Sequence, residues 1–296
     1  MYKYVLCLSL LMYALAPVSA CDVCGCAPSG TSSGLLEYSY RNYIRTQYQL
    51  TRFSQNQPGD RISLDRKHAI QFNASFLIGK KIRVSLDIPY YSTVRYTNSV
   101  PSYQTKGIGD SWIKVGWLHR KTFDDNRSFS VEIGSGVQVP LGEHAEAFPD
   151  FDETPYWFYP GTGSFALQGY ARAVYKHRDF FWNLVYSTTW FLPTNWEYHP
   201  GQQLVAGSFF RYQLSPGNWK IFPVVGAQYE HLQADIYEEE AVHGTGGNNW
   251  IGSIGIDVNK GRIILGTNIQ LPIFQHLGGG AIHQQAGINT NLSIIF

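Results

Sequence analysis

The feature that most constrains this chain is a two-residue alternation of apolar and polar side chains over long segments. Between residues 68 and 79, apolar side chains take every second position, and amide or hydroxyl side chains take most positions between them. The apolar set is Ile70, Phe72, Ala74, Phe76 and Ile78. Because successive side chains of a strand point to opposite faces, this pattern predicts strands with one apolar and one polar face.

The alternation recurs along the chain and predicts about twelve strands. The segments are residues 36–53, 67–79, 81–95, 109–121, 127–140, 163–176, 178–192, 202–214, 218–232, 247–258, 260–273 and 283–296. The connections between them are alternately short and long, with longer ones at 54–66 and 96–108, among others. This pattern is typical of an all-β, transmembrane, antiparallel up-and-down β-barrel with short periplasmic turns and longer external loops.

Composition favours a membrane barrel over a water-soluble β-sandwich, which alternates in the same way. Charged residues make up 15% of the chain, against about 25% in soluble domains. The apolar faces run for five or six alternating positions, which suits membrane strands of about 9–11 residues. Aromatic residues near segment ends suggest interfacial girdles. These are Tyr90, Tyr91, Trp112, Trp117, Trp190 and Trp250.

The first twenty residues have the features of an export signal. A basic start at Lys3, an apolar stretch over 5–15 and a small-residue site at 18–20 match a cleaved signal peptide. We expect three parts: residues 1–20 as signal peptide, 21–35 as a cysteine-containing periplasmic leader and 36–296 as the barrel. Loss of Lys3 leaves 22 basic and 22 acidic residues. The absence of a basic tract argues against a nucleic-acid partner.

Three cysteines follow the expected cleavage site, at Cys21, Cys24 and Cys26. Residues 18–21 fit a lipobox, so Cys21 is a candidate for acylation and the protein a candidate lipoprotein. The three thiolates could instead bind a soft metal ion such as Cu(I) or Zn(II). Disulfide formation in an oxidising compartment, or an inert leader, are the other interpretations. We expect no cofactor.

The last segment ends on an aromatic residue, Phe296, with apolar residues at alternate positions before it. A terminal aromatic on such a strand resembles the signal read by the outer-membrane barrel assembly machinery. Together with the signal peptide, it predicts location in a Gram-negative outer membrane. The expected partners are the assembly machinery, outer-membrane lipid and a small solute of unknown identity.

The polar faces predict what lines the interior of the barrel. The lumen-lining candidates are Arg83, Asp87, Glu132, Arg172, Arg211, Glu230, Arg262 and Gln270. Further charged residues assigned to this face are Arg41, Arg45, Lys114 and Asp257. The positive groups outnumber the negative ones, so the interior leans cationic. Either it is a water-filled channel with a slight preference for anions, or the charges pair and fill the barrel.

The remaining sequence motifs do not indicate an enzyme. No Gly-x-Ser-x-Gly elbow or His-Glu-x-x-His helix is present, and we expect no enzyme. Acidic groups of the expected external loops, Asp235 among them, are interpreted as solvated charge. Proline follows an apolar residue at Pro89, Pro140, Pro193 and Pro272. Because proline cannot donate to a strand ladder, these positions predict strand ends or bulges at the external rim.

Several short motifs in order resemble an outer-membrane transporter family named for a protein of the meta-cleavage pathway of phenol degradation. They are the Cys-Asp-Val-Cys-Gly-Cys start at 21–26, Gly-Ile-Gly-Asp at 107–110, the stretch 134–142, Pro-Gly-Thr-Gly-Ser at 160–164, Thr-Gly-Gly at 245–247 and residues 269–275. The resemblance implies a monomeric-type barrel that takes up small molecules, and it carries over no catalytic or ligand residues. The stretch 276–283 departs from the family pattern.

The function expected from the sequence is passage of a small solute through a polar lumen, as in a porin-like transporter. Two alternatives stay open. One is a barrel that handles a soft metal through Cys21, Cys24 and Cys26. The other is a closed structural or adhesive barrel whose interior is filled by ion pairs.

Overall fold

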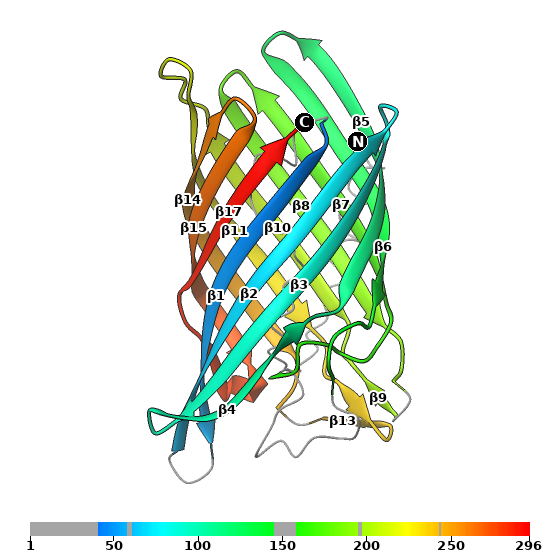
Figure 1. Ribbon diagram of the computed structural model, residues 1–296, viewed down its shortest axis with the longest axis vertical. Helices are drawn as coiled ribbons and strands as arrows, with labels where there is room; N and C mark the ends of the chain where they lie inside the picture. The colour runs from blue at the N-terminus through cyan, green and yellow to red at the C-terminus, as the bar shows by residue number, and fades with distance from the viewer. Residues whose placement is uncertain (1–40, 58–60, 145–157, 195–196, 243) are drawn as a thin grey trace, which may run out of the picture.

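A computed structural model describes residues 41–57, 61–144, 158–194, 197–242 and 244–296. In these residues, twelve long strands form a closed antiparallel barrel in which chain neighbours lie side by side (Figure 1). The strands are β1 (Tyr43–Gln57), β2 (Arg61–Ile78), β3 (Ile82–Thr97), β5 (Ser111–Asp124), β6 (Arg127–Val139), β7 (Ala166–His177), β8 (Phe180–Phe191), β10 (Gln203–Tyr212), β11 (Lys220–Leu232), β14 (Gly247–Lys260), β15 (Ile263–Leu277) and β17 (Gly287–Ile295). The predicted fold class is confirmed.

The last strand closes the barrel. β17 pairs with β1 from Tyr43↔Ile295 to Leu50↔Ile288, and with β15 on its other side. Phe296 follows β17, and its backbone N–H donates to the Asn42 carbonyl at 3.0 Å. The final segment is therefore the seam, as its alternation predicts. Recognition of Phe296 by an assembly machinery stays a prediction.

The two ends of the barrel differ. Both ends of the described chain lie at one end (Figure 1), which we call the turn end. The connections there are short and cover 79–81, 125–126, 178–179, 213–219 and 261–262. The opposite, loop end carries the long connections and their small elements. These are β4 (Val100–Ile108), β9 (Tyr198–His199), β12 (Ile236–Tyr237), β13 (Glu240–Ala241), the 3-10 turn η3 (Gly278–Gly280) and β16 (Ile282–Gln284).

Strands extend further at the loop end than the sequence pattern predicts. Residues 54–66 and 96–108 were expected to be loops, but β1 and β2 remain paired as far as Gln57↔Arg61. β3 and β4 form a hairpin that turns at Asn98 and Ser99, both with positive φ. These extensions lie past the apolar belt, where the outer face carries polar side chains such as Arg66. Pairing continues there without an apolar face, so alternation does not report it.

The barrel wall is apolar outside and polar inside. On β2, Ile70 and Phe76 are 48% and 46% exposed on the outer surface, whereas Gln71 and Ser75 are 5% and 0% exposed inside. Outside, near the turn end, the Trp182 and Phe210 rings stack with centroids 6.1 Å apart. None of the described helices is long and apolar enough to cross a membrane. An outer surface of this kind is stable in lipid, whereas a soluble protein would bury its apolar face.

Two aromatic residues expected in the girdles point inward instead. Tyr91 and Trp112 are buried in the interior, while Tyr90 is exposed on the outer surface. The assignment of Tyr90 and Tyr91 to one girdle was wrong because adjacent residues of a strand face opposite sides. Trp117, Trp190 and Trp250 are exposed on the outside, as expected.

The four apolar-proline pairs fall into two groups. Pro140 directly follows β6, and Pro193 lies two residues after β8. Pro89 and Pro272 lie within β3 and β15. Pro89 is where the pairing partner of β3 changes from β5 to β4, and Pro272 is beside a register shift between β14 and β15. All four sites tolerate the missing N–H.

Candidate functional site: the barrel interior

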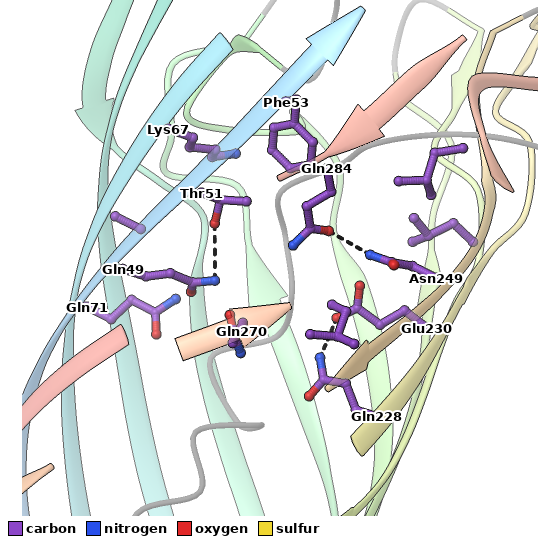
Figure 2. A pocket seen from close by; sticks show the side chains of 14 residues that line it. Gln49, Thr51, Phe53, Lys67, Gln71, Gln228, Glu230, Asn249, Gln270 and Gln284 are labelled. Atoms are coloured by element: carbon purple, nitrogen blue, oxygen red, sulfur yellow. Dashed lines mark hydrogen bonds between the residues drawn. The ribbon is translucent and has the colours of Figure 1, made fainter. Parts of the chain in front are cut away.

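The loop-end half of the interior contains a polar hollow, which we call the amide chamber. It lies between β1, β2, β11, β14, β15 and β16 (Figure 2) and, with the open solvent at its mouth, holds about 620 Å³ of space not filled by atoms. Six amide side chains line it: Gln49, Gln71, Gln228, Asn249, Gln270 and Gln284. The alternation of these strands places them, because each occupies a position that faces inward.

Hydrogen bonds hold several of these side chains in place but leave capacity for a solute. Gln49 Nε2 donates to Thr51 Oγ1 at 3.3 Å, and Asn249 Nδ2 donates to Gln284 Oε1 at 2.6 Å. Among the described residues, the Gln228 Oε1 and Asn249 Oδ1 atoms have no hydrogen-bond donor. An amide side chain both donates and accepts hydrogen bonds. The chamber can therefore bind water or polar solutes that act as donors or as acceptors.

The chamber also contains two ionisable side chains on facing walls. Lys67 comes from β2, and its Nζ lies 4.5 Å from the centroid of the Tyr91 ring. Glu230 comes from β11 and accepts a hydrogen bond from Gln228 Nε2 at 2.5 Å. Figure 2 shows Lys67 and Glu230 on opposite sides of the hollow. One positive and one negative group thus share the lining with six amides, the Thr51 hydroxyl and several apolar side chains.

Nearer the turn end, charged side chains pair across the wall in what we call the ion-pair layer. The three pairs are Arg83 Nε with Glu132 Oε2 at 3.3 Å, Lys114 Nζ with Asp87 Oδ2 at 2.9 Å, and Arg211 Nε with Asp257 Oδ2 at 3.7 Å. Each of the six side chains is less than a tenth exposed. The structure thus brings together most of the charges that the sequence assigns to the interior.

Arg172 joins this layer through Tyr170 and Glu132. Glu132 and Arg172 are opposite each other in the β6–β7 ladder. Tyr170 Oη donates to Glu132 Oε1 at 2.9 Å, and the Arg172 guanidinium lies 5.0 Å from the centroid of the Tyr170 ring. Gly134 makes room for this phenol, since a Cβ there would lie 2.5 Å from the Tyr170 hydroxyl.

The interior becomes apolar at the turn end. One cluster contains Tyr43, Ile264 and Ile295 at the seam. The second contains Val174, Phe181 and Phe222, with the two phenylalanine rings 5.9 Å apart. A third apolar cluster, Phe53, Leu277 and Ile282, lies at the loop end beside the amide chamber.

The remaining lumen candidates divide between the chamber and the surface. Gln270 and Glu230 line the amide chamber. Arg262 is exposed in the turn between β14 and β15, so its assignment to the interior was wrong. Arg41, which precedes β1, is exposed as well. In both cases the two-residue alternation was extended past the end of the strand. Outside a strand, it no longer determines whether a side chain faces the interior or the outside.

Three interior charges were missed: Lys67, Asp65 and Arg95. The Arg95 guanidinium donates to both carboxylate oxygens of Asp65, at 2.8 and 2.7 Å. Asp65 lies where the sequence predicted a loop, and Lys67 and Arg95 are at predicted strand ends. Continuing the inward series Asn73, Gln71 backward by twos would have reached Lys67 and Asp65.

A buried carboxylate anchors the long β6–β7 connection over the loop end. Asp110 accepts hydrogen bonds from Thr162 N and Oγ1, both at 2.7 Å, from Gln138 Nε2 at 3.0 Å and from Gly142 N at 3.1 Å. Burial raises the pKa of Asp110, and these donors oppose the rise. Three motifs that carry the family resemblance, 107–110, 134–142 and 160–164, meet at this carboxylate.

A second buried carboxylate, Asp235, joins two other connections at the loop end. Its side chain accepts hydrogen bonds from the Tyr198 hydroxyl and from Gly201 N, and its own N–H donates to Thr245 Oγ1 at 3.1 Å. The expectation of a solvated charge was wrong, because Asp235 is 2% exposed. β9, β12 and β13 form a small sheet beside it.

The expected signal peptide, leader and cysteine cluster lie outside the described residues. Acylation of Cys21 and metal binding by Cys21, Cys24 and Cys26 therefore stay predictions. In the described ranges, no group of three or more His, Cys, Asp or Glu side chains is arranged to hold a metal ion.

Comparison with known proteins supports the fold. No family model and no curated protein matches the sequence. Among solved structures, an outer-membrane channel from Pseudomonas putida F1 is similar, with a TM-score of 0.68 and 11% identity over 95% of this chain and 100% of that chain. The KdgM porin (TM-score 0.46, 10% identity, 86% of this chain, 99% of that chain) and the β domain of the Bordetella autotransporter BrkA (0.46, 9%, 86%, 100%) are more distant. The fold is that of Gram-negative outer-membrane barrels.

Proposed function

We propose that this protein is an outer-membrane channel that passes small hydrophilic solutes through the barrel interior. The observation that carries the proposal is the amide chamber, a hollow lined by six amide side chains inside a closed barrel with an apolar outer surface. Apolar side chains outside and hydrogen-bonding side chains inside separate a water-compatible path from lipid. A twelve-stranded barrel is wider than the eight-stranded barrels that side chains fill completely.

Two further observations support transport rather than catalysis. The fold resembles that of the channel from Pseudomonas putida F1 along its whole length. The motifs of the phenol meta-pathway transporter family also have a structural role here, because three of them meet at Asp110. Membership of that family is part of the proposal.

The interior charges suggest only a slight ion preference. Arg83, Lys114 and Arg211 each pair with a carboxylate. The positive electrostatic potential inside the barrel is therefore weaker than the excess of positive residues in the sequence predicts. Arg45 and Arg172 add positive charge beside Asp257 and Asp87. We therefore keep a weak anion preference as part of the proposal, to be read from the reversal potential in a salt gradient.

Liposome swelling tests the channel directly. Proteoliposomes that contain the purified protein should swell in isosmotic erythritol faster than protein-free liposomes. Gln71→Trp fills the chamber and should slow swelling, because an indole replaces a smaller amide on the inner face. Ile70→Trp is the matched control, since the adjacent residue faces the outside and should leave the rate unchanged. Equal rates with and without protein would contradict the proposal.

One alternative has specific support: a closed structural barrel. The ion-pair layer and the apolar clusters at the turn end fill part of the interior. This interpretation predicts no swelling with the wild-type protein. The soft-metal alternative is tested separately by metal titration of the mature protein. Replacement of Cys21, Cys24 and Cys26 together should abolish binding if that alternative is correct.

A further inference from the structure

Two charges in the amide chamber differ from four cations buried elsewhere in the barrel wall. Arg95, Arg83, Lys114 and Arg211 each pair with a carboxylate at 2.7–3.7 Å. Lys67 and Glu230 form no ion pair with any other residue that the structure describes. Lys67 is nevertheless only 7% exposed. A buried ammonium without a counter-ion is costly, so this position favours an anion from outside the chain.

We propose that the chamber is a selectivity site for small zwitterions of the amino-acid type. This inference rests on the proposed channel function and names its solute class. The solute carboxylate would approach Lys67 on β2, and the solute ammonium would approach Glu230 on β11. Both side chains line the same hollow, from opposite sides (Figure 2), and we place the solute between them.

The rest of the chamber suits the body of such a solute. Six amide side chains line it and can hydrogen-bond along the length of a bound molecule. The free acceptors Gln228 Oε1 and Asn249 Oδ1 can receive N–H or O–H donors. Tyr91 contacts Lys67 through its ring and keeps the ammonium on the wall. Amide side chains therefore contribute hydrogen bonds without adding a third charge.

Other solute classes match these groups less well. A neutral polyol binds the amides but leaves both charges without a counter-ion. A simple carboxylate satisfies Lys67 but faces Glu230 with a like charge, and a simple amine has the opposite conflict. Only a solute with both charges complements both walls.

Swelling rates in two isosmotic solutes of similar size test the inference: L-serine as the zwitterion and erythritol as the neutral polyol. The wild-type protein should admit serine several-fold faster than erythritol. Lys67→Gln and Glu230→Gln should each remove this preference while erythritol still enters. Lys80→Gln makes the same change on the exposed turn between β2 and β3 and should keep the preference. The exchanged pair Lys67→Glu with Glu230→Lys should restore it.

The outcomes separate the two proposals. Equal serine and erythritol rates in the wild type, or a preference retained by both single variants, would overturn the zwitterion site while erythritol entry upholds the channel. Entry of neither solute would overturn the channel, and the zwitterion site with it. Heat-modifiable migration on gels shows whether each variant has folded as a barrel, and the exchanged pair provides a second route if a single variant does not fold.

Discussion

The two halves of the barrel interior accommodate buried polar side chains in different ways. Both halves place polar side chains inside a wall whose outer face is apolar. Toward the turn end, oppositely charged side chains on different strands form ion pairs at 2.9–3.7 Å and are buried. Toward the loop end, Arg95 and Asp65 also pair, but amides line a hollow in which two charges have no ion-pair partner among the described residues. Paired charges stabilise a wall, whereas a hollow lined by amides leaves room for a solute.

The largest expected difference between the halves concerns stability. Lys114→Met leaves the Asp87 carboxylate buried without its partner and should lower the free energy of unfolding by about 3–5 kcal/mol. The measurement is urea unfolding of the refolded barrel in lipid vesicles. The double variant Lys114→Met with Asp87→Leu should recover most of the loss. If the single variant unfolds like the wild type, the ion-pair layer does not stabilise the wall.

A smaller effect is expected where Asp110 anchors the loop end. Asp110→Ala removes the acceptor for the backbone N–H groups of Gly142 and Thr162 and should cost about 1–3 kcal/mol locally. Hydrogen exchange should accelerate at Gly142 and Thr162 but not in the turn-end halves of the strands. Faster exchange throughout the barrel would show that the loop anchor and the wall are one cooperative unit.

A modest effect is expected in the chamber. Asn249→Leu removes the hydrogen bond to Gln284 and should change stability by about 0.5–1.5 kcal/mol. Urea unfolding under the same conditions allows direct comparison with Lys114→Met. An effect as large as that of Lys114→Met would remove the energetic distinction between the amide chamber and the ion-pair layer.

The smallest effect is expected for an ion pair outside the barrel wall. Asp124 and Arg127 pair at 2.6 Å at the β5–β6 turn, where both are well exposed. Water and salt screen such pairs, so Asp124→Asn should leave the urea midpoint unchanged. A measurable shift would show that pairing distance, rather than burial, determines the contribution of the ion pairs.

The sequence predicts the membrane-spanning part of the fold well, because lipid imposes a strict alternation on each strand. The even number of strands and the closing role of 283–296 follow from it. The hairpin at β3–β4 was missed because it lacks a continuous apolar face. Tyr91 and Trp112 were misplaced because aromatic composition was read without the side that each residue faces.

The site was predicted only in part. Arg83, Asp87, Glu132 and Arg211 face inward because alternation fixes their side, but their pairing depends on strand neighbours and shear, which one strand does not encode. Lys67 and the amide chamber were not recognised as a site. The hollow is formed by side chains of β1, β2, β11 and β14 together. The residue pattern of any single strand therefore does not predict that a hollow exists. The loop anchors likewise join residues as far apart as Asp110 and Thr162.

The most direct test of the central claim, that the amide chamber is the solute path, is single-channel conductance in planar bilayers. Gln270→Trp places an indole in the chamber, and Ile269→Trp places one on the outer surface one residue away. We predict discrete channel steps for the wild type, clearly smaller steps for Gln270→Trp and unchanged steps for Ile269→Trp. Absence of steps in the wild type, or equal steps in all three proteins, would contradict the claim.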